Sequence, residues 1–460
     1  MTNQFTKFLN DPKTIEAKAV LLQNLQNYQA QIQTVKAADT DLAMDYQKAI
    51  EEFSTQRGGA LFFPYLASGL GRGCLVELAD GSVKYDLING IGVHHFGHSH
   101  PKVIEACLDA ALSDTVMQGN LQQNAASAKF VKTILKCANQ NGATFEHGFL
   151  SCTGVMAGEN ALKLAYQKSQ PADRIFAFEK CFMGRTLAMS QFTDKAAYRQ
   201  GLPLNCKVDY VPFFDANDAE GSTARALHAI QKQIKRYPGS HAAMSFELVL
   251  GEGGFYFGTP EFYKTLMTEL KKHNIAILVD EVQSFARTSQ LFAFQHFGLD
   301  ELVDVVWFGK ASQVCGTLYR ATFKPKPGLL SQTFTGSTTA IAAGQVIVDT
   351  LMTENYFGAT GKITALANEF QTRLQALAKK YPDRLSGPFG LGAMVAFTPF
   401  GGDADKTLKL VKALFQNGLI CFNAGDTPAR IRFLLPVGAV TQNDIEPIFK
   451  ILETTLCEIN

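Results

Sequence analysis

Two polar residues follow apolar runs in the second half of the chain, and their chemistry is complementary. The run at 275–279 ends at Asp280, and the run at 303–309 ends at Lys310. In an open parallel sheet, ligands bind beyond the carboxyl ends of the strands. A carboxylate and an amine would therefore emerge at one edge if the two runs are neighbouring strands. Such a pair is either part of an active site or only a buried ion pair.

A possible phosphate-binding turn and an aromatic ring precede this pair. Residues 151–164 predict a strand, a glycine turn and a helix whose first N–H groups suit an anion. Many crossover turns use glycine in this way without binding anything. Phe182 follows another predicted strand, where its ring would either lie flat on a planar cofactor or pack in the core.

The elements that must position these residues show two patterns. From about residue 90, short apolar runs alternate with helix-like stretches, which predicts βα units and a mostly parallel, buried sheet. After about residue 340 the pattern becomes a long helix followed by short strands, which indicates a separate α+β domain. We therefore expect a helical extension and arm at 1–89, a large α/β domain at 90–340 and a small C-terminal domain at 341–460.

Composition narrows the function classes. The chain has 460 residues and a net charge of only +1, which argues against nucleic acid or an acidic membrane as a partner. Its nine cysteines are scattered singly, as in a protein with reduced thiols. No apolar run approaches the roughly 20 residues that a membrane-spanning helix needs. We expect a cytoplasmic enzyme that binds small molecules.

Taken together, the segments resemble the class III aminotransferases, the group of ornithine, acetylornithine, 4-aminobutyrate and lysine ε-aminotransferases. The resemblance runs from about Gly69 to the C-terminus and implies the fold of pyridoxal-phosphate-dependent transferases of fold type I, with pyridoxal 5'-phosphate bound by the large domain. The segments that carry it are 86–93, Gly-His-Ser-His-Pro at 97–101, Thr-Gly-Val at 153–155, Phe-Met-Gly-Arg-Thr at 182–186, Val-Asp-Glu-Val-Gln at 279–283, Phe-Gly-Lys at 308–310, Gly-Ser-Thr at 336–338 and Arg-Phe at 432–433.

The resemblance assigns catalytic roles to Lys310 and Asp280. It implies that Lys310 forms the Schiff base with the cofactor aldehyde and that Asp280 faces the pyridine nitrogen. A carboxylate there keeps the nitrogen protonated, so that the ring can accept an electron pair. The displaced lysine amine is then placed to carry a proton. The other implied contacts are Gln283 with the ring hydroxyl, Phe182 over one ring face, and the N–H groups of Gly154 and Val155 with the phosphate.

The resemblance also implies a homodimer and a reaction. Thr338 would bind the phosphate of the neighbouring subunit, so that the two subunits share their active sites. The terminal amino group of an ω-amino or diamino acid would pass to 2-oxoglutarate, giving a semialdehyde and glutamate. Arg432 would bind the carboxylate beside the reacting carbon, and Glu252 would pair with Arg432 when the amino donor is bound. Arg185 would hold the distal carboxylate. Glu247 is a further candidate for steadying the site.

Several alternatives stay open. Each arginine could instead serve a surface or interface ion pair. An aminomutase or a decarboxylase of the same fold is the alternative reaction, although a paired glutamate and arginine favours a two-substrate transamination. Three segments beside the expected pocket depart from the family pattern and leave the amino donor undefined: 248–250, 284–286 and 339–342.

Two other patterns suggest a metal site and a dinucleotide-binding turn, but neither has the spacing that such a site needs. The histidines at 94–100 lack the spacing of a third zinc ligand, so no metal site is expected. The glycines at 69–73 do not have the GxGxxG spacing of a dinucleotide-binding turn, and no strong predicted strand precedes them.

Overall fold

The computed structural model describes residues 3–459, which form two compact units. Unit 1 takes in the chain up to Ser113, the segment Glu369–Pro388 and the chain from Val395 onward. Unit 2 takes in Asp114–Asn368 and Phe389–Met394. The chain therefore begins in unit 1, builds most of unit 2 and then returns to unit 1. The domain limits expected at residues 90 and 341 remain predictions.

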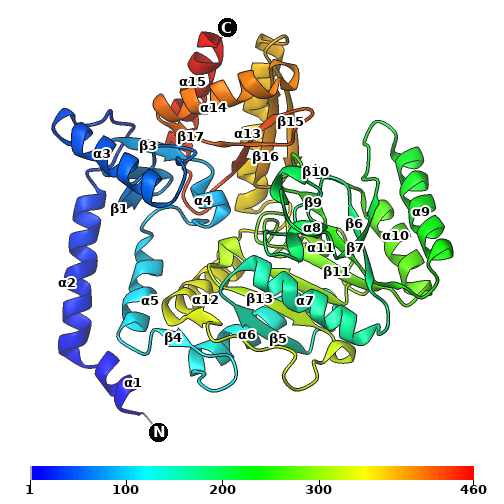
Figure 1. Ribbon diagram of the computed structural model, residues 1–460. Coiled ribbons are helices and arrows are strands. Elements are labelled where there is room, and N and C mark those ends of the chain that lie inside the picture. Colours follow the sequence, from blue (N-terminus) through cyan, green and yellow to red (C-terminus); the bar gives the residue numbers. More distant parts are fainter. Residues whose placement is uncertain (1–2, 460) are drawn as a thin grey trace. The chain divides into compact units, whose positions relative to one another are not determined.

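A seven-stranded sheet forms the centre of unit 2 and confirms the expected α/β fold (Figure 1). Its strand order is β5-β13-β12-β11-β8-β6-β7, and neighbouring strands are parallel except where β13 pairs with β12 and β5. The strands are β5 His147–Ser151, β6 Arg174–Phe178, β7 Lys207–Val211, β8 His241–Glu247, β11 Ala276–Glu281, β12 Val305–Phe308 and β13 Cys315–Tyr319.

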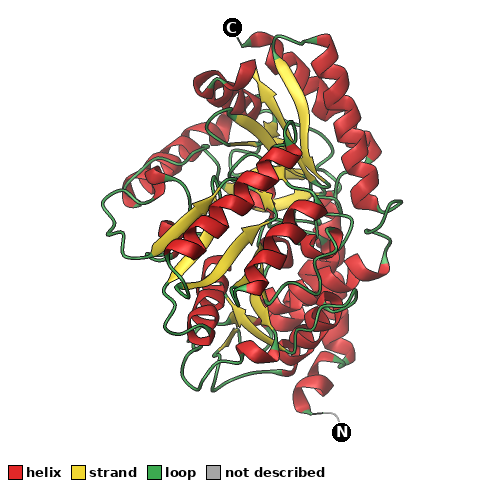
Figure 2. Cartoon of the chain, turned by 90° about the vertical axis from the view of Figure 1, so that its right-hand side faces the viewer, coloured by secondary structure: helices red, strands yellow, loops and turns green. Residues whose placement is uncertain are grey.

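Helices lie in front of and behind these strands (Figure 2). Because both faces are covered, every residue of β8 and of β11 is buried, which explains their continuous apolar runs. The helices of unit 2 are α6 Ala125–Ala138, α7 Gly154–Lys168, α8 Met189–Phe192, α9 Ala219–Arg236, α10 Pro260–Lys272, α11 Ala293–His296 and α12 Thr338–Thr353, while α13 Lys362–Lys380 runs from unit 2 into unit 1. Two short antiparallel pairs complete the unit: β4 Val116–Met117 with β14 Gly336–Ser337, and β9 Val249–Leu250 with β10 Tyr256–Phe257.

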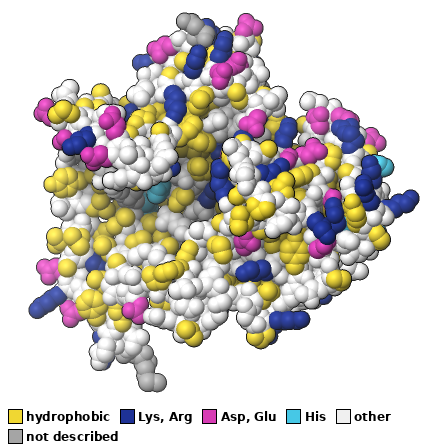
Figure 3. Space-filling view, in the orientation of Figure 1, with side chains coloured by type: hydrophobic (Ala, Val, Ile, Leu, Met, Phe, Trp, Pro, Cys, Tyr) yellow, Lys and Arg dark blue, Asp and Glu magenta, His cyan; other side chains and the backbone are white. Residues whose placement is uncertain are grey.

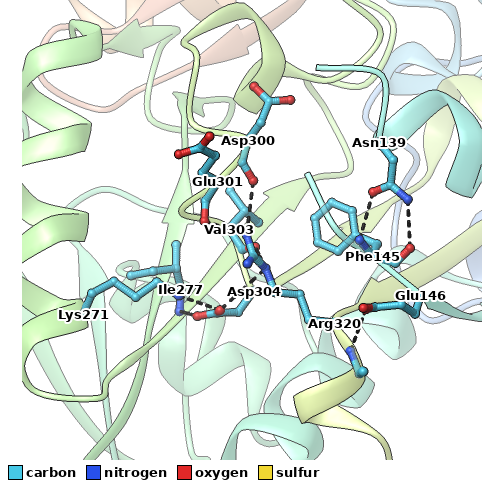
Figure 4. A network of polar contacts seen from close by, with 11 residues as sticks. Asn139, Phe145, Glu146, Lys271, Ile277, Asp300, Glu301, Val303, Asp304 and Arg320 are labelled. Carbon is cyan, nitrogen blue, oxygen red and sulfur yellow. Dashed lines mark hydrogen bonds and ion pairs between the residues drawn. The ribbon is translucent and has the colours of Figure 1, made fainter. Parts of the chain in front are cut away.

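Polar contacts fasten strands β11, β12 and β13 at the ends remote from Asp280 (Figure 4). Asp304, just before β12, lies 2.5 Å from Lys271 Nζ and accepts a 2.8 Å hydrogen bond from the Ile277 N–H of β11. Arg320, just after β13, donates to the carbonyl of Val303 at 2.8 Å. These contacts fix where the three strands start and end relative to one another, and hence where their opposite ends lie.

Unit 1 contains the N-terminal and C-terminal segments. Its helices are α1 Gln4–Leu9, α2 Pro12–Gln29, α3 Thr40–Gln56, α4 Asn89–Gly92, α5 Pro101–Ala111, α14 Ala404–Gln416 and α15 Gln442–Glu458. One four-stranded sheet consists of β1 Ala67–Arg72, β2 Leu75–Leu78, β3 Val83–Asp86 and β17 Leu419–Ile420. The other has the order β15 Leu385–Leu391, β16 Met394–Pro399, β19 Arg430–Leu434 and β18 Phe422–Ala424.

The surface agrees with the near-zero net charge. Acidic and basic side chains are interspersed on the face that Figure 3 shows. Within residues 3–459, no helix combines the length and the apolar character that a membrane span requires.

Candidate active site

Asp280 and Lys310 end two strands that pair directly. Strands β11 and β12 are parallel, and Asp280 lies opposite Trp307, three residues before Lys310. Burial raises the pKa of Asp280 to about 7, while the N–H of Val282 and the Lys310 ammonium favour its charged form. The structure therefore brings the predicted carboxylate and amine to the same edge of the sheet.

The backbone of Lys310 has an unusual conformation. Its φ angle is +51°, in the left-handed region that side chains other than glycine seldom adopt. The preceding Gly309 packs so closely that a Cβ there would lie 2.7 Å from the Cys315 sulfur. Strain of this kind persists where the surroundings fix the backbone, and it is common at functional sites.

A second carboxylate, Glu247, lies on the neighbouring strand β8, on the side of Asp280 away from β12. It ends β8 in register with Asp280 and is buried. Its two oxygens accept hydrogen bonds from the backbone N–H groups of Phe182 at 3.0 Å and Gly251 at 2.8 Å. Burial, together with the Asp280 carboxylate, raises the pKa of Glu247 to about 8. Glu247 therefore joins two loops to the strand that lies next to Asp280.

Helix α7 supplies the expected anion-binding end. It begins at Gly154 and Val155, and its N-cap residue Thr153 accepts a 3.2 Å hydrogen bond from the N–H of Met156. The first N–H groups of a helix have no partner within the helix and suit a phosphate. Gly154 is needed here because a Cβ would lie 2.9 Å from both methyl groups of Val282. This contact places the start of α7 beside the loop that follows Asp280.

The remaining predicted residues of unit 2 lie on loops around this edge. Half-buried Phe182 is joined to Glu247 through its N–H. Gln283 is buried, and its amide packs on Gly251, where a Cβ would come within 2.5 Å. Glu252 is half-buried in the turn between β9 and β10. Arg185 is exposed, with its guanidinium carbon 3.7 Å from the centre of the Tyr198 ring.

Thr338 and Arg432 are held by contacts within their own units. Thr338 starts α12, where its hydroxyl donates to the carbonyl of Asp114 and its N–H donates to Thr115 at 3.0 Å. Arg432 lies on β19 of unit 1, fully buried, with its guanidinium carbon 5.6 Å from the centre of the Phe422 ring. The predicted pairing of Arg432 with a glutamate of unit 2 stays a prediction.

The histidine segment has a structural contact of its own. His98 Nε2 lies 3.1 Å from Asp86 Oδ2, and the same carboxylate accepts hydrogen bonds from the N–H groups of Ile88 at 3.0 Å and Asn89 at 2.6 Å. Among residues 3–459, no three His, Cys, Asp or Glu side chains are grouped so that they could hold a metal ion.

The groups in unit 2 fit pyridoxal phosphate. The buried Asp280 suits a protonated ring nitrogen, Lys310 offers an amine, and the start of α7 offers N–H groups to a phosphate, with no room for a Cβ at Gly154. Fold and site together define a pyridoxal-phosphate-dependent enzyme of fold type I. The family model of aminotransferase class-III matches residues 63–456, and the chain belongs to this family.

Similar proteins agree with this assignment. Acetylornithine aminotransferase 1 of Bradyrhizobium diazoefficiens is 29% identical over 404 residues, which cover 85% of this chain and 92% of that protein. The 4-aminobutyrate aminotransferase of Escherichia coli is 30% identical over 383 residues, which cover 79% of this chain and 87% of that protein. A solved lysine aminotransferase from M. tuberculosis has a TM-score of 0.76 at 22% identity and covers 85% of this chain and 94% of its own, which supports the fold. The chain is a pyridoxal-phosphate-dependent aminotransferase.

Proposed function

We propose that the enzyme moves the terminal amino group of an ω-amino or diamino acid to 2-oxoglutarate, giving a semialdehyde and glutamate. The observation that carries the proposal is the meeting of Asp280 and Lys310 at the ends of two paired strands. The relatives that are acetylornithine, diaminobutyrate and 4-aminobutyrate aminotransferases support a donor of this class. We therefore propose a donor of the lysine, ornithine, acetylornithine or 4-aminobutyrate type.

Asp280 and Lys310 have separate tasks in this proposal. Bound pyridoxal phosphate supplies an aldehyde that takes up the amino group and a ring that withdraws electrons from the reacting carbon. The buried Asp280 carboxylate would hold the proton on the ring nitrogen, because a negative charge beside that nitrogen favours its protonated form. Lys310 would hold the cofactor through its Nζ, and the same Nζ would accept the proton from the donor carbon.

Four further residues would hold the cofactor. The N–H groups of Gly154 and Val155, at the start of α7, would bind its phosphate. Phe182 would cover one face of the ring and Gln283 would contact the ring hydroxyl. The Glu247 hydrogen bonds to the Phe182 N–H and to the turn on which Gln283 packs support these placements.

Two arginines and a glutamate would allow two different substrates to use one pocket. Arg185 would bind the distal carboxylate, with the paired N–H groups that suit a carboxylate. Arg432 would bind the carboxylate beside the reacting carbon of the oxoacid. Glu252 would pair with Arg432 when an ω-amine is bound. Arg432 would then not bind the carboxylate of an α-amino acid in place of the ω-amine donor.

The test follows the visible absorbance of the holoenzyme as each candidate donor is added without an acceptor. We expect one donor to remove the absorbance of the lysine-bound cofactor and 2-oxoglutarate to restore it. Lys310→Ala should lose both this absorbance and the activity. Absorbance that no donor removes would instead favour the aminomutase or decarboxylase, and absorbance that persists in Lys310→Ala would contradict the role of Lys310.

A further inference from the structure

The guanidinium of Arg185 lies against an aromatic ring. Its central carbon is 3.7 Å from the centre of the Tyr198 ring and 5.8 Å from that of Phe182. The two rings are 6.0 Å apart and nearly perpendicular, at 87°. Arg185 is exposed, whereas both rings are half-buried. The aromatic neighbours therefore restrict a side chain that would otherwise move freely in solvent.

One residue, Thr193, anchors both loops that make this contact. Its hydroxyl accepts hydrogen bonds from the N–H groups of Met183 at 2.9 Å and Gly184 at 3.2 Å, and it donates to the Gly184 carbonyl at 3.1 Å. These bonds fix the turn that precedes Arg185. The Thr193 carbonyl accepts a 2.7 Å hydrogen bond from Arg199, the residue after Tyr198. The arginine and its ring partner are thus held by a common support.

The position of Tyr198 leaves the hydrogen-bonding edge of the guanidinium available. A guanidinium stacks on a ring through its face, and it binds a carboxylate through N–H groups in its own plane. Both contacts can exist at once because they use different directions. The ring also lies 5.1 Å from Lys195 Nζ, so a second positive charge contacts the same ring.

We propose that Tyr198 is a positioning residue that orients Arg185 for the distal carboxylate of the dicarboxylate substrate. The inference rests on the proposed function, because it assumes the substrate role of Arg185. In this proposal Tyr198 acts through Arg185 and not on the reacting atoms or the cofactor. It therefore sets the preference for a dicarboxylic over a monocarboxylic oxoacid without taking part in proton transfer.

The test measures glutarate binding to the holoenzyme by calorimetry, because glutarate carries two carboxylates and does not react. Tyr198→Leu should weaken glutarate binding by about twofold to fivefold, the range that a cation–π contact at an exposed site supports. In steady-state assays with the active donor, KM for 2-oxoglutarate should rise by the same factor, while kcat and the KM for pyruvate stay unchanged. Tyr198→Phe keeps the ring and should restore most of the affinity.

A double variant distinguishes the possible failures. If Tyr198 acts through Arg185, Arg185→Ala with Tyr198→Leu should bind glutarate no more weakly than Arg185→Ala alone. Unchanged glutarate binding in Tyr198→Leu, with a loss in Arg185→Ala, would overturn the role of Tyr198 and leave the proposed function standing. If glutarate binding is also unchanged in Arg185→Ala, the substrate role of Arg185 is wrong and the role of Tyr198 fails with it. An equal rise in KM for 2-oxoglutarate and pyruvate would show a structural role and overturn the inference.

Discussion

Three carboxylates stand at the ends of two adjacent strands, and burial affects all of them. Glu247, Asp280 and Glu281 are each buried, and burial raises their pKa values to about 8, 7 and 7. Their surroundings differ, however. Glu281 accepts hydrogen bonds from the Ser284 hydroxyl and the Phe294 N–H, while the Lys310 ammonium acts on the other two. Only Asp280 is proposed to face the cofactor nitrogen.

We predict that cofactor affinity decreases as the pH is lowered, because Asp280 becomes protonated. Its pKa is about 7 in the absence of cofactor, so at lower pH the carboxylate takes up a proton and loses its attraction for a protonated ring nitrogen. Affinity should therefore decline below pH 7, by up to about tenfold per pH unit. Asp280→Asn should bind the cofactor more weakly at pH 8 and lose this pH dependence. Titration of apoenzyme with pyridoxal phosphate from pH 6 to 8 measures both effects.

Glu281 provides the matched control for this prediction. It neighbours Asp280 on β11 and its pKa is also about 7, but its oxygens are engaged by Ser284 and Phe294. Glu281→Gln should keep the decline in cofactor affinity below pH 7. A flat profile in the wild type, or the same loss of slope in Glu281→Gln, would show that Asp280 is not the titrating group.

At the scale of elements, the start of helix α7 depends on a glycine that touches the Asp280 loop. A Cβ at Gly154 would lie 2.9 Å from both methyl groups of Val282. Alanine is otherwise favoured over glycine in a helix. Helix propensity therefore predicts that Gly154→Ala stabilises α7, whereas packing predicts that it destabilises the start of α7. We predict that Gly154→Ala weakens cofactor binding about tenfold, because the helix start must move away from the loop. Adding Val282→Ala should restore affinity, since it removes both methyl groups.

The control for Gly154 is Gly59, where an added Cβ meets no atom within 4 Å. Gly59→Ala should leave cofactor affinity unchanged. A Gly154→Ala variant with wild-type affinity, or a double variant that is no better than the single one, would contradict the packing argument.

A largely buried ion pair, with side chains 16% and 8% exposed, fixes the starts of strands β6 and β8. Arg174 donates two 2.7 Å hydrogen bonds to Asp209 on β7, and His241 Nε2 lies 2.8 Å from the same carboxylate. Burial raises the pKa of Asp209, but the bonds from His241 and Arg174 outweigh it and bring the value down to about 2. The contribution of the Asp209 charge to the free energy of unfolding is therefore fully present above about pH 4 and is lost as the pH falls towards 2.

We predict that Asp209→Asn lowers the free energy of unfolding by about 2–4 kcal/mol at pH 7, because Arg174 keeps its charge without a charged partner. Asp173 is the matched control: its bond to Lys207 is 2.5 Å long, but both side chains are about half exposed, at 55% and 54%. Asp173→Asn should change stability by less than about 1 kcal/mol. Urea unfolding of the two variants measures the difference, and equal losses would contradict the role assigned to burial.

These elements show what the sequence could reveal. Strands β6 and β12 were predictable because both faces of the sheet are covered, which leaves unbroken apolar runs at 175–178 and 305–308. Asp280 and Lys310 were predictable because they end such runs. The contacts of Glu247 were not, because its hydrogen bonds reach the N–H of Phe182, 65 positions away. That contact depends on how two loops meet, which hydrophobic periodicity does not encode.

At the scale of the whole molecule, the placement of Thr338 raises the question of which subunit completes the site. The resemblance to class III aminotransferases implies that Thr338 binds the phosphate of the neighbouring subunit of a homodimer. Within one chain, the Thr338 hydroxyl donates to the Asp114 carbonyl, and the Cys152 thiol donates to the Phe334 carbonyl at 3.0 Å. The segment that leads to Thr338 thus lies beside the residues that lead into α7 of the same chain. A contact within one chain is the alternative to a contact across the dimer.

We predict that a hybrid dimer of Lys310→Ala and Thr338→Ala subunits recovers one complete site. In a shared arrangement, the intact Lys310 of one subunit meets the intact Thr338 of its partner, so half of the sites should bind pyridoxal phosphate with wild-type affinity. If Thr338 acts within its own chain, the only site with an intact Lys310 carries the Thr338→Ala change, and its affinity should equal that of the Thr338→Ala homodimer.

The hybrid is isolated with two different affinity tags, and its cofactor affinity and activity are compared with those of both homodimers. Recovery of about half the wild-type activity supports the shared site. Affinity no better than Thr338→Ala, or a wild-type protein that is monomeric by sedimentation, would contradict it.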